Sequence, residues 1–185
     1  MERLIIVEGP QGVGKSTLAN YLRDNIAGSN LYRLSGQKDK TLTGLEYSKI
    51  MYTALIKYLQ EMQSVPMDMI FDRTFTTEEV YARLGYKDYS FTKEYNYYLS
   101  ELSNLKYEMY YFPLYLENVD LYRKRLDRGE HHLYQEFSLQ NSIDQQNMYL
   151  MLAEDMMKKY NSIHVIPLAM DNFDYTEVKR LLKIK

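Results

Sequence analysis

The chain of 185 residues contains no cysteine, which excludes a disulfide scaffold, a thiolate metal site and a cysteine nucleophile. It has no long hydrophobic run either, since no segment approaches the roughly 20 apolar residues of a membrane-spanning helix. The run Leu4–Val7 is too short for the core of a signal peptide, so we expect a mature cytoplasmic protein that contacts no membrane. The formal net charge is only -2, so no overall basic field is available to attract a polymeric nucleic acid.

Tryptophan is absent and prolines number only four, whereas tyrosine is abundant, with 20 Tyr beside 6 Phe. Hydrophobic residues make up 45% and charged residues 26%, a composition typical of globular proteins and not of disordered ones. A chain of this length buries roughly 70% of its unfolded surface, which is enough for one core. We therefore predict a single domain over residues 1–185. Composition leaves open whether the tyrosines form core, subunit surface or a stacking pocket.

Five short apolar runs are typical of buried strands, and longer segments with helical spacing lie between them. The runs are Leu4–Val7, Leu31–Leu34, Met69–Phe71, Met109–Leu116 and Ile163–Pro167. In Gly44–Gln63 and Ser142–Tyr160, apolar residues recur every three or four positions, as in amphipathic helices. The alternation predicts an α/β fold, a five-stranded parallel sheet flanked by helices on both faces. Ligands of such sheets bind at the carboxyl ends of the strands, here in the loops after Val7, Phe71 and Leu116.

The first of these loops reads Gly9-Pro10-Gln11-Gly12-Val13-Gly14-Lys15-Ser16 and matches the phosphate-binding pattern G-x-x-x-x-G-K-[ST]. Glycines let such a loop curl so that its backbone N–H groups point at a phosphate chain, and the positive end of the following helix adds to the attraction. We therefore expect a P-loop NTPase-type fold that binds ATP and Mg²⁺. In this expectation Lys15 contacts the β- and γ-phosphates as a catalytic residue, and Ser16 ligates the metal. The expected ATP-binding residues are Gly9, Gln11, Gly12, Val13, Gly14, Lys15, Ser16 and Thr17.

The third predicted strand ends in the pair Asp72-Arg73. The D-x-x-G and N-K-x-D sequences of a GTPase are missing, and an Asp-Arg pair suits phosphoryl transfer between two small molecules. Arg73 can neutralise an anionic acceptor through two parallel hydrogen bonds. Asp72 can hold Mg²⁺ through water or accept a proton from the acceptor. We predict that both residues are catalytic and that Asp72 also belongs to the metal site.

A basic cluster, Arg-Lys-Arg-Leu-Asp-Arg-Gly-Glu, follows the fourth predicted strand over residues 123–130. On a helix, Arg125 and Arg128 lie three positions apart and share one face. Arginines on a mobile lid can close over the transferred γ-phosphate and exclude water, which protects ATP from hydrolysis. A solvated basic helix end is the alternative interpretation. We predict a short lid over about residues 123–136, with Arg125 and Arg128 as catalytic residues.

These motifs give the chain a resemblance, over nearly its whole length, to the thymidylate kinase-like nucleotide kinases, which include the deoxynucleoside kinases. Glu8–Thr17 is similar to that family's loop E-G-x-[DE]-G-x-G-K-[ST]-T, with Gln11 where an acid often stands. Asp72–Tyr81 is similar to D-R-[YFH]-x-x-S-x-x-A-Y, with Thr77 in place of the serine. The family's R-E-P-G-G segment is represented only by Arg33–Gly36.

The resemblance implies a kinase that transfers the γ-phosphoryl group of ATP to a small nucleotide. It implies that Glu8, Arg33, Arg73 and Tyr81 bind the acceptor, with Arg73 on its phosphate and Tyr81 against its sugar. Asp72 favours a deoxynucleoside monophosphate as the acceptor, because deoxynucleoside kinases usually have Glu-Arg here. Among these acceptors the resemblance makes dTMP the first choice. A deoxynucleoside kinase and a nucleotide-binding module without turnover stay open as alternatives. The resemblance and two Met- and Tyr-rich helices, more than a small sheet must cover, predict a homodimer.

Overall fold

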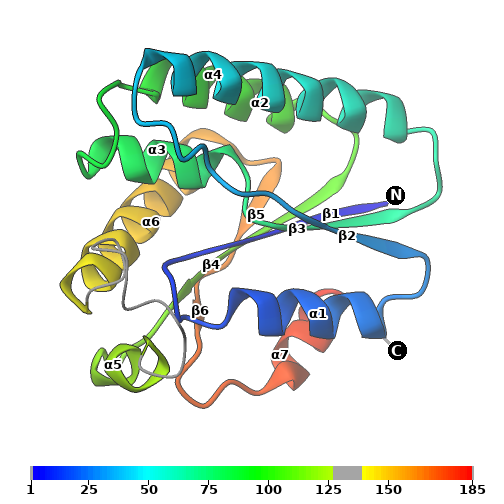
Figure 1. Ribbon diagram of the computed structural model, residues 1–185. Coiled ribbons are helices and arrows are strands. Elements are labelled where there is room, and N and C mark those ends of the chain that lie inside the picture. Colours follow the sequence, from blue (N-terminus) through cyan, green and yellow to red (C-terminus); the bar gives the residue numbers. More distant parts are fainter. Residues whose placement is uncertain (1, 127–138, 185) are drawn as a thin grey trace.

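The structure is a computed structural model that describes residues 2–126 and 139–184. Its centre is a parallel sheet in the order β2-β3-β1-β4-β5, with the short β6 paired to β4 (Figure 1). The strands are β1 (Arg3–Glu8), β2 (Ser29–Arg33), β3 (Asp68–Asp72), β4 (Glu108–Tyr115), β5 (Ile163–Val165) and β6 (Leu168–Ala169). Each predicted strand is present, so the α/β prediction of a five-stranded parallel sheet is confirmed. The sixth strand is a finding of the structure, because the chain returns to β4 directly after Pro167.

Helices cover both faces of this sheet. They are α1 (Lys15–Asn25), α2 (Leu42–Met62), α3 (Phe75–Arg83), α4 (Thr92–Ser103), α5 (Asp120–Leu126), α6 (Leu139–Lys159) and α7 (Tyr175–Leu181). Figure 1 shows α2, α3 and α4 on one side of the strands and α1 and α7 on the other. Within the described residues, every helix is too short or too polar to span a bilayer.

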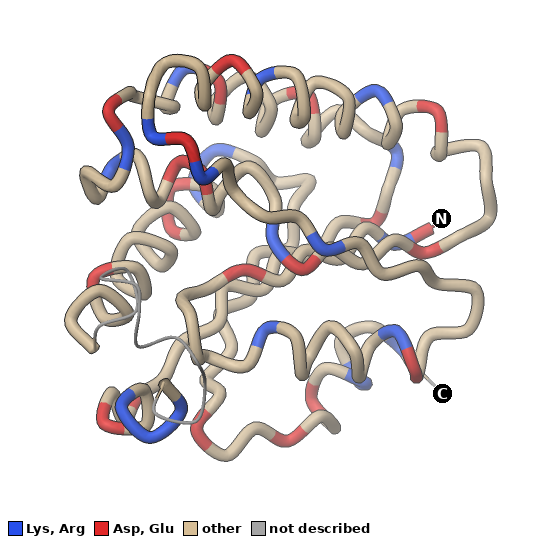
Figure 2. The backbone as a smooth tube through the Cα atoms, viewed as in Figure 1, with Lys and Arg blue, Asp and Glu red and all other residues tan. Residues whose placement is uncertain are grey.

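The strands are buried on both faces, which explains their continuous apolar sequences. In β1, Leu4 and Ile6 belong to a core formed with α2, α3, α4 and α6. Their neighbours Ile5 and Val7 point the other way, into a second core formed with α1, α5 and α7. The sheet therefore separates two hydrophobic cores, one on each face. Polar side chains lie at the ends of the strands. Figure 2 shows basic and acidic residues interspersed over the whole fold, in keeping with the small net charge.

Two helices that the apolar patterns did not predict lie directly beyond β3. Helix α3 is buried almost all round, including Thr76, Thr77, Glu78 and Glu79, so its sequence has no alternation between a polar and an apolar face. Helix α4 does bury Tyr95, Tyr98, Leu99 and Leu102 at helical spacing. The tyrosines between residues 86 and 98 thus serve mainly in packing, since Tyr89, Tyr95 and Tyr98 are all core residues.

Candidate active site

The phosphate loop (Gly9–Ser16) leaves the end of β1 and turns into α1. Gly14 caps α1 with a φ of 110°, a left-handed conformation that favours glycine. Gly9 lies against β4, where a Cβ atom would stand 2.9 Å from the carbonyl oxygen of Leu114. The loop borders a cavity of about 730 Å³, whose described lining residues are Gln11–Thr17, Arg33, Leu34, Asp72, Arg73, Arg125, Met170, Asp171, Phe173 and Tyr175. The predicted loop residues Gln11–Thr17 therefore line one open site. Gly9 lies at the junction where the loop leaves the sheet and packs against β4.

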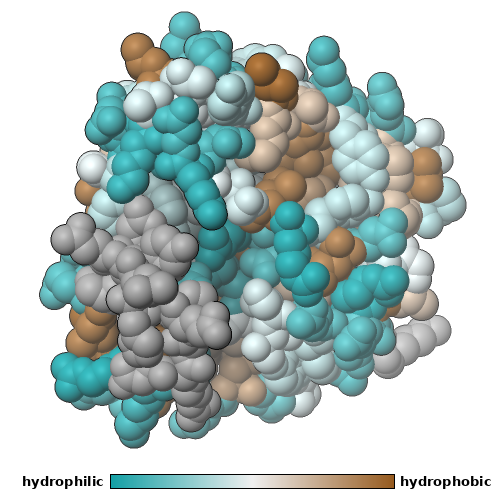
Figure 3. Space-filling model, viewed as in Figure 1, coloured by the Kyte–Doolittle hydropathy of each residue, from teal (hydrophilic) through white to brown (hydrophobic). Residues whose placement is uncertain are grey.

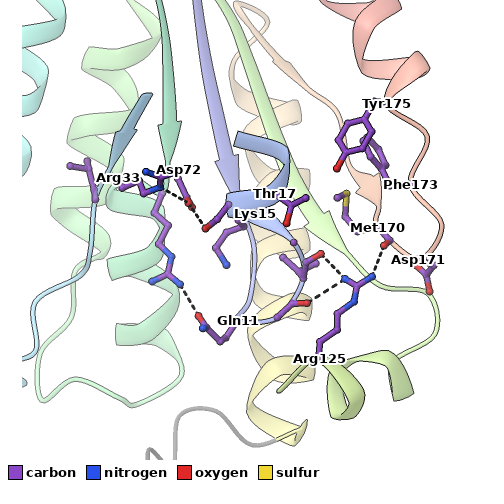
Figure 4. A pocket seen from close by; sticks show the side chains of 16 residues that line it. Gln11, Lys15, Thr17, Arg33, Asp72, Arg125, Met170, Asp171, Phe173 and Tyr175 are labelled. Atoms are coloured by element: carbon purple, nitrogen blue, oxygen red, sulfur yellow. Dashed lines mark hydrogen bonds and ion pairs between the residues drawn. The ribbon is translucent and has the colours of Figure 1, made fainter. Parts of the chain in front are cut away.

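This cavity has two ends of different character, on either side of Lys15 (Figure 4). Arg33, Leu34, Asp72 and Arg73 form what we call the arginine end, at the carboxyl ends of β2 and β3. Met170, Asp171, Phe173 and Tyr175 form the aromatic end, between β6 and α7. The phosphate loop lies between the two, so a ligand on the loop can contact both.

Lys15 is the buried cation at the centre of the site. Its ammonium group donates a hydrogen bond of 2.6 Å to the carbonyl of Pro10, within the phosphate loop itself. Burial lowers the pKa of Lys15 to about 7, and the nearby positive charge of Arg73 acts in the same direction. The acids Asp72 and Glu8 oppose this shift. An anion bound on the loop would offset the positive charges of Lys15 and Arg73 and so raise the pKa of Lys15.

Ser16 and Asp72 bring two oxygen donors together. The Ser16 hydroxyl donates to Asp72 Oδ2 at 2.7 Å, and Arg33 Nε lies 3.9 Å from the same oxygen. The strand register explains the meeting, because Val7, Asp72 and Arg33 lie side by side at the ends of β1, β3 and β2. A hydroxyl beside a carboxylate suits Mg²⁺, which commonly takes one or two protein ligands and completes its shell with phosphate and water. No group of three or more His, Asp or Glu side chains with metal-binding geometry occurs in the described part of the chain.

Arg73 follows Asp72 with a φ of 77°, a left-handed conformation that is strained for a residue with a side chain. Its N–H donates to the Val7 carbonyl at 3.1 Å, which holds this turn against β1. Its guanidinium donates to Gln11 Oε1 at 3.0 Å. Burial alone would lower the pKa of Arg73, but Tyr149, Tyr81 and the nearby acids raise it. The side chain is thus a permanent positive charge held at the arginine end, in contact with Gln11 of the phosphate loop.

Glu8 lies behind this turn and outside the described lining of the cavity. Its Oε1 accepts hydrogen bonds from the Thr74 N–H at 2.6 Å and the Thr74 hydroxyl at 2.8 Å, and its Oε2 accepts from Thr77 at 2.9 Å. Complete burial raises the pKa of Glu8 to about 7, against the opposite effect of these hydrogen bonds. The geometry places Glu8 as a support for the start of α3.

Tyr81, predicted as a sugar contact, also lies outside the cavity lining. Its ring packs edge-on against Tyr86, with 5.5 Å between the ring centroids, and it borders the core around α2 and α3. It still lies close enough to Arg73 to influence the pKa of that residue. The spacing of nine residues from Asp72 therefore brings Tyr81 near the arginine end.

Arg125, at the end of α5, closes one side of the phosphate loop. Its guanidinium donates to the carbonyls of Gly12 at 3.3 Å and Val13 at 2.9 Å, and to the carbonyl of Met170 at 2.9 Å. The side chain thereby joins the loop to the aromatic end (Figure 4). The predicted partner Arg128 and most of the predicted lid, residues 127–136, lie outside the described residues.

The aromatic end was not predicted from the sequence. Asp171 accepts hydrogen bonds from the backbone N–H groups of Glu117 at 2.8 Å and Asn118 at 2.7 Å, which ties this segment to the turn after β4. Tyr175 stacks on Tyr21 of α1 with 3.9 Å between the ring centroids. The available signal was a pair of aromatic residues just beyond the last predicted strand, too weak to interpret without the fold.

Comparison with solved structures decides what kind of fold carries this site. The Candida albicans thymidylate kinase is similar to the chain with a TM-score of 0.65 and 18% identity, over 98% of this chain and 89% of that one. The chain has the fold of the phosphate-loop nucleoside and nucleotide kinases. The Bacillus subtilis YorR protein, solved in complex with phosphorylated GDP, gives a TM-score of 0.59 at 18% identity over 97% and 93% of the two chains.

A third solved structure of this fold is the deoxyadenosine kinase of M. mycoides with bound dATP. It matches with a TM-score of 0.55 and 13% identity, over 99% of this chain and 98% of that one. Neither the protein-family models nor the curated proteins give a match to the sequence. The similarity to this kinase fold thus lies in the course of the backbone, and the chemistry must be argued from the side chains above.

Proposed function

We propose that the chain is a kinase that uses Mg²⁺ and ATP to phosphorylate a deoxynucleoside monophosphate, dTMP in the first place. The observation that carries this proposal is the arginine end of the cavity, where Arg33 and Arg73 flank Asp72 beside the phosphate loop. Two guanidinium groups there match a phosphate that the acceptor already carries. The likeness to the Candida albicans thymidylate kinase is why dTMP comes first.

The acids of the cavity support a phosphate acceptor over an alcohol. The described lining residues include two carboxylates, Asp72 and Asp171. Asp72 accepts a hydrogen bond from Ser16, and Asp171 is held by backbone N–H groups at the aromatic end. A hydroxyl acceptor needs a general base, whereas an ionised phosphate oxygen attacks without losing a proton. An acceptor that brings its own anionic oxygen therefore suits this site better.

In this proposal each element of the site has one task. The loop amides and Lys15 hold the β- and γ-phosphates of ATP, and Ser16 and Asp72 would hold Mg²⁺, which neutralises charge on the phosphates when bound. Arg73 and Arg33 hold the phosphate of the acceptor in line with the γ-phosphate. Catalysis then consists of positioning and charge neutralisation, since phosphoryl transfer needs little covalent help from the protein.

The aromatic end would receive the base of ATP. Phe173, Tyr175 and Met170 offer flat and polarisable surfaces, on which a purine ring stacks favourably. Arg125 joins this end to the carbonyls of the phosphate loop and so keeps the base and phosphate positions at a fixed separation. We propose that Arg125 acts in this way, and that Arg128 in the adjoining lid segment closes the site.

A deoxynucleoside kinase is the second candidate, favoured by the likeness to the M. mycoides deoxyadenosine kinase. In that case Asp72 would act as a base towards a 5′-hydroxyl through Oδ1, the oxygen that does not accept the Ser16 hydrogen bond. A module that binds nucleotide without turnover is the third candidate.

An acceptor panel distinguishes the three. ADP release with Mg·ATP is measured against each deoxynucleoside monophosphate and each deoxynucleoside, with Lys15→Met as the variant that lacks the phosphate-binding cation. The proposal expects turnover with monophosphates, dTMP foremost, and none with Lys15→Met. Turnover with nucleosides alone would favour the second candidate. Stabilisation of the fold by ATP without consumption of any acceptor would favour the third.

A further inference from the structure

A buried ion pair lies beyond the cavity, where α3 faces the segment that joins β2 to α2. Lys87 Nζ stands 3.0 Å from Glu78 Oε1, and the two side chains are 3% and 0% exposed. The Tyr89 hydroxyl donates to the same carboxylate oxygen. Burying two charges carries a desolvation penalty that attraction between them often only balances. A pair at this depth is therefore poorly explained as a simple source of stability.

The pair holds one residue of the neighbouring segment from both sides. The N–H of Gln37 donates to Glu78 Oε2 at 3.2 Å, and the ammonium group of Lys87 donates to the carbonyl of Gln37. Three residues further on, the Asp88 N–H donates to the Lys40 carbonyl at 2.8 Å. The conformation of the segment is thus set by contacts with α3 and the turn that follows it.

This segment, residues 34–40, begins at the arginine end of the cavity. Leu34 lines the cavity, and its N–H donates to the carbonyl of Asp72 at 3.1 Å. The segment then passes across α3 on its way to α2 (Figure 1). At Gly36 it approaches so closely that a Cβ atom would stand 2.9 Å from Glu78 Oε2. A loop fixed at Leu34 and again at Gln37 leaves little freedom to the residues between.

We propose that Glu78 and Lys87 are positioning residues, which hold segment 34–40 so that Arg33 and Leu34 meet the acceptor in one defined geometry. Neither residue is among the described lining residues of the cavity, and in this proposal they act through the backbone of Gln37. The inference rests on the proposed function, because it assigns the acceptor to the arginine end. Binding sites on loops gain accuracy when neighbouring residues lock the loop from behind.

The test uses the double variant Glu78→Gln with Lys87→Met, which removes both charges and leaves neither of them buried alone. The single variant Glu78→Gln keeps the shape of the side chain and is measured as the second variant, although it leaves the charge of Lys87 buried without its partner. The matched control is Glu154→Gln with Lys158→Met, an exposed pair on α6 whose charged atoms lie 3.9 Å apart. Amide hydrogen exchange over residues 34–41 and steady-state kinetics with the acceptor and with ATP are both measured.

We expect the double variant to raise the KM for the acceptor by about tenfold or more and to leave the KM for ATP within about twofold, since misplacement of a contact weakens the ligand that uses it. Amide exchange at Gln37 should accelerate by about tenfold or more as the segment opens locally. Glu78→Gln should change both quantities in the same direction, and the control should change neither.

Three results would overturn the inference. They are unchanged exchange at Gln37 in both Glu78 variants, faster exchange with an unchanged KM for the acceptor, and an equal rise of both KM values. If the wild-type protein consumes no acceptor at all, the proposed function fails. Positioning of the segment then stands or falls on the exchange measurement alone, which needs no activity.

Discussion

The Ser16 hydroxyl and the Asp72 carboxylate share a hydrogen bond of 2.7 Å although 56 positions separate them along the chain. One residue belongs to the first turn of α1 and the other to the last position of β3. Adjacent parallel strands β1 and β3 bring these two places together. The contact brings the two sequence motifs that predicted a metal site together as one pair of neighbouring oxygen atoms.

A first prediction concerns this pair. Asp72→Asn keeps an oxygen that can accept the Ser16 hydrogen bond but removes the negative charge that a cation needs. With Mg·ATP and dTMP, kcat should fall by about 100-fold or more, because charge neutralisation at the phosphates is lost. Calorimetric titration with ATP should show that Mg²⁺ strengthens binding to the wild type and not to Asp72→Asn. Asp171→Asn, at the other end of the cavity, is the control. Equal Mg²⁺ dependence in Asp72→Asn and the wild type would contradict the assignment.

Two substitutions of Arg73 should have the same effect on activity and different effects on stability. Arg73→Gly and Arg73→Ala both remove the guanidinium, so kcat/KM for the acceptor should fall by a similar large factor, about 1000-fold. Their stabilities should differ, because glycine accepts the φ of 77° without strain. Urea unfolding should show Arg73→Gly to be more stable than Arg73→Ala by about 1 kcal/mol. Arg23→Ala, at an exposed position on α1, should affect neither quantity. A stability order with alanine above glycine would refute the strain at this turn.

Glu8 predicts a dependence of stability on pH. Its pKa is raised from 4.5 to about 7 by burial, so the folded state favours the protonated form. This contribution is fully present below about pH 4.5 and is lost as the pH rises through about 7. Glu8→Gln carries no such proton, so the wild type should lose about 3 kcal/mol relative to this variant between pH 4.5 and pH 8. Urea unfolding across this range measures the difference. Parallel stability curves for the two proteins would show that Glu8 is ionised in the fold.

Lys15 predicts proton uptake when ATP binds. Its pKa is lowered to about 7, so near pH 8 most of the empty protein carries a neutral amine there. The negative charge of a bound triphosphate raises this pKa, and the amine then takes up a proton. The apparent binding enthalpy at pH 8 should therefore differ between Tris and HEPES by up to the difference between the ionisation enthalpies of the two buffers, as expected for the uptake of about one proton. In Lys15→Arg the dependence on buffer should vanish, because arginine stays charged. Equal enthalpies for the wild type in the two buffers would contradict the prediction.

The predicted homodimer is testable through α2 and α4. Leu42 and Ile50 on α2 are each 68% exposed and Tyr97 on α4 is 54% exposed, and Figure 3 shows hydrophobic residues at this end of the molecule. Burying such side chains against a second copy would stabilise a dimer. Sedimentation at micromolar concentration should give a dimer for the wild type and a monomer for Ile50→Glu. Arg23→Glu, at an exposed position of α1 on the other side of the sheet, is the control. A wild-type monomer would remove the prediction.

The secondary structure was predictable from the sequence wherever the pattern of burial gives a regular pattern of apolar residues along the chain. Strands buried on both faces appear as unbroken apolar runs, and the long helices α2 and α6 show their buried stripes. Helix α3 was not predicted because it is buried on nearly every side and buries polar residues such as Glu78 and Thr77. Their partners Lys87 and Glu8 come from other elements, so no local pattern could indicate that these polar groups are satisfied.

The sequence by itself determined the phosphate loop, because its chemistry resides in one continuous stretch whose glycines, lysine and serine act through local backbone geometry. It also located Asp72 and Arg73, since the end of a buried strand places them at the edge of the sheet. Only the tertiary structure decided that Glu8 supports α3 from behind, that Arg125 holds the loop carbonyls, and that Phe173 and Tyr175 form the other end of the cavity. These relationships join residues far apart in the chain, and their distances depend on the strand order and on how helices pack over it.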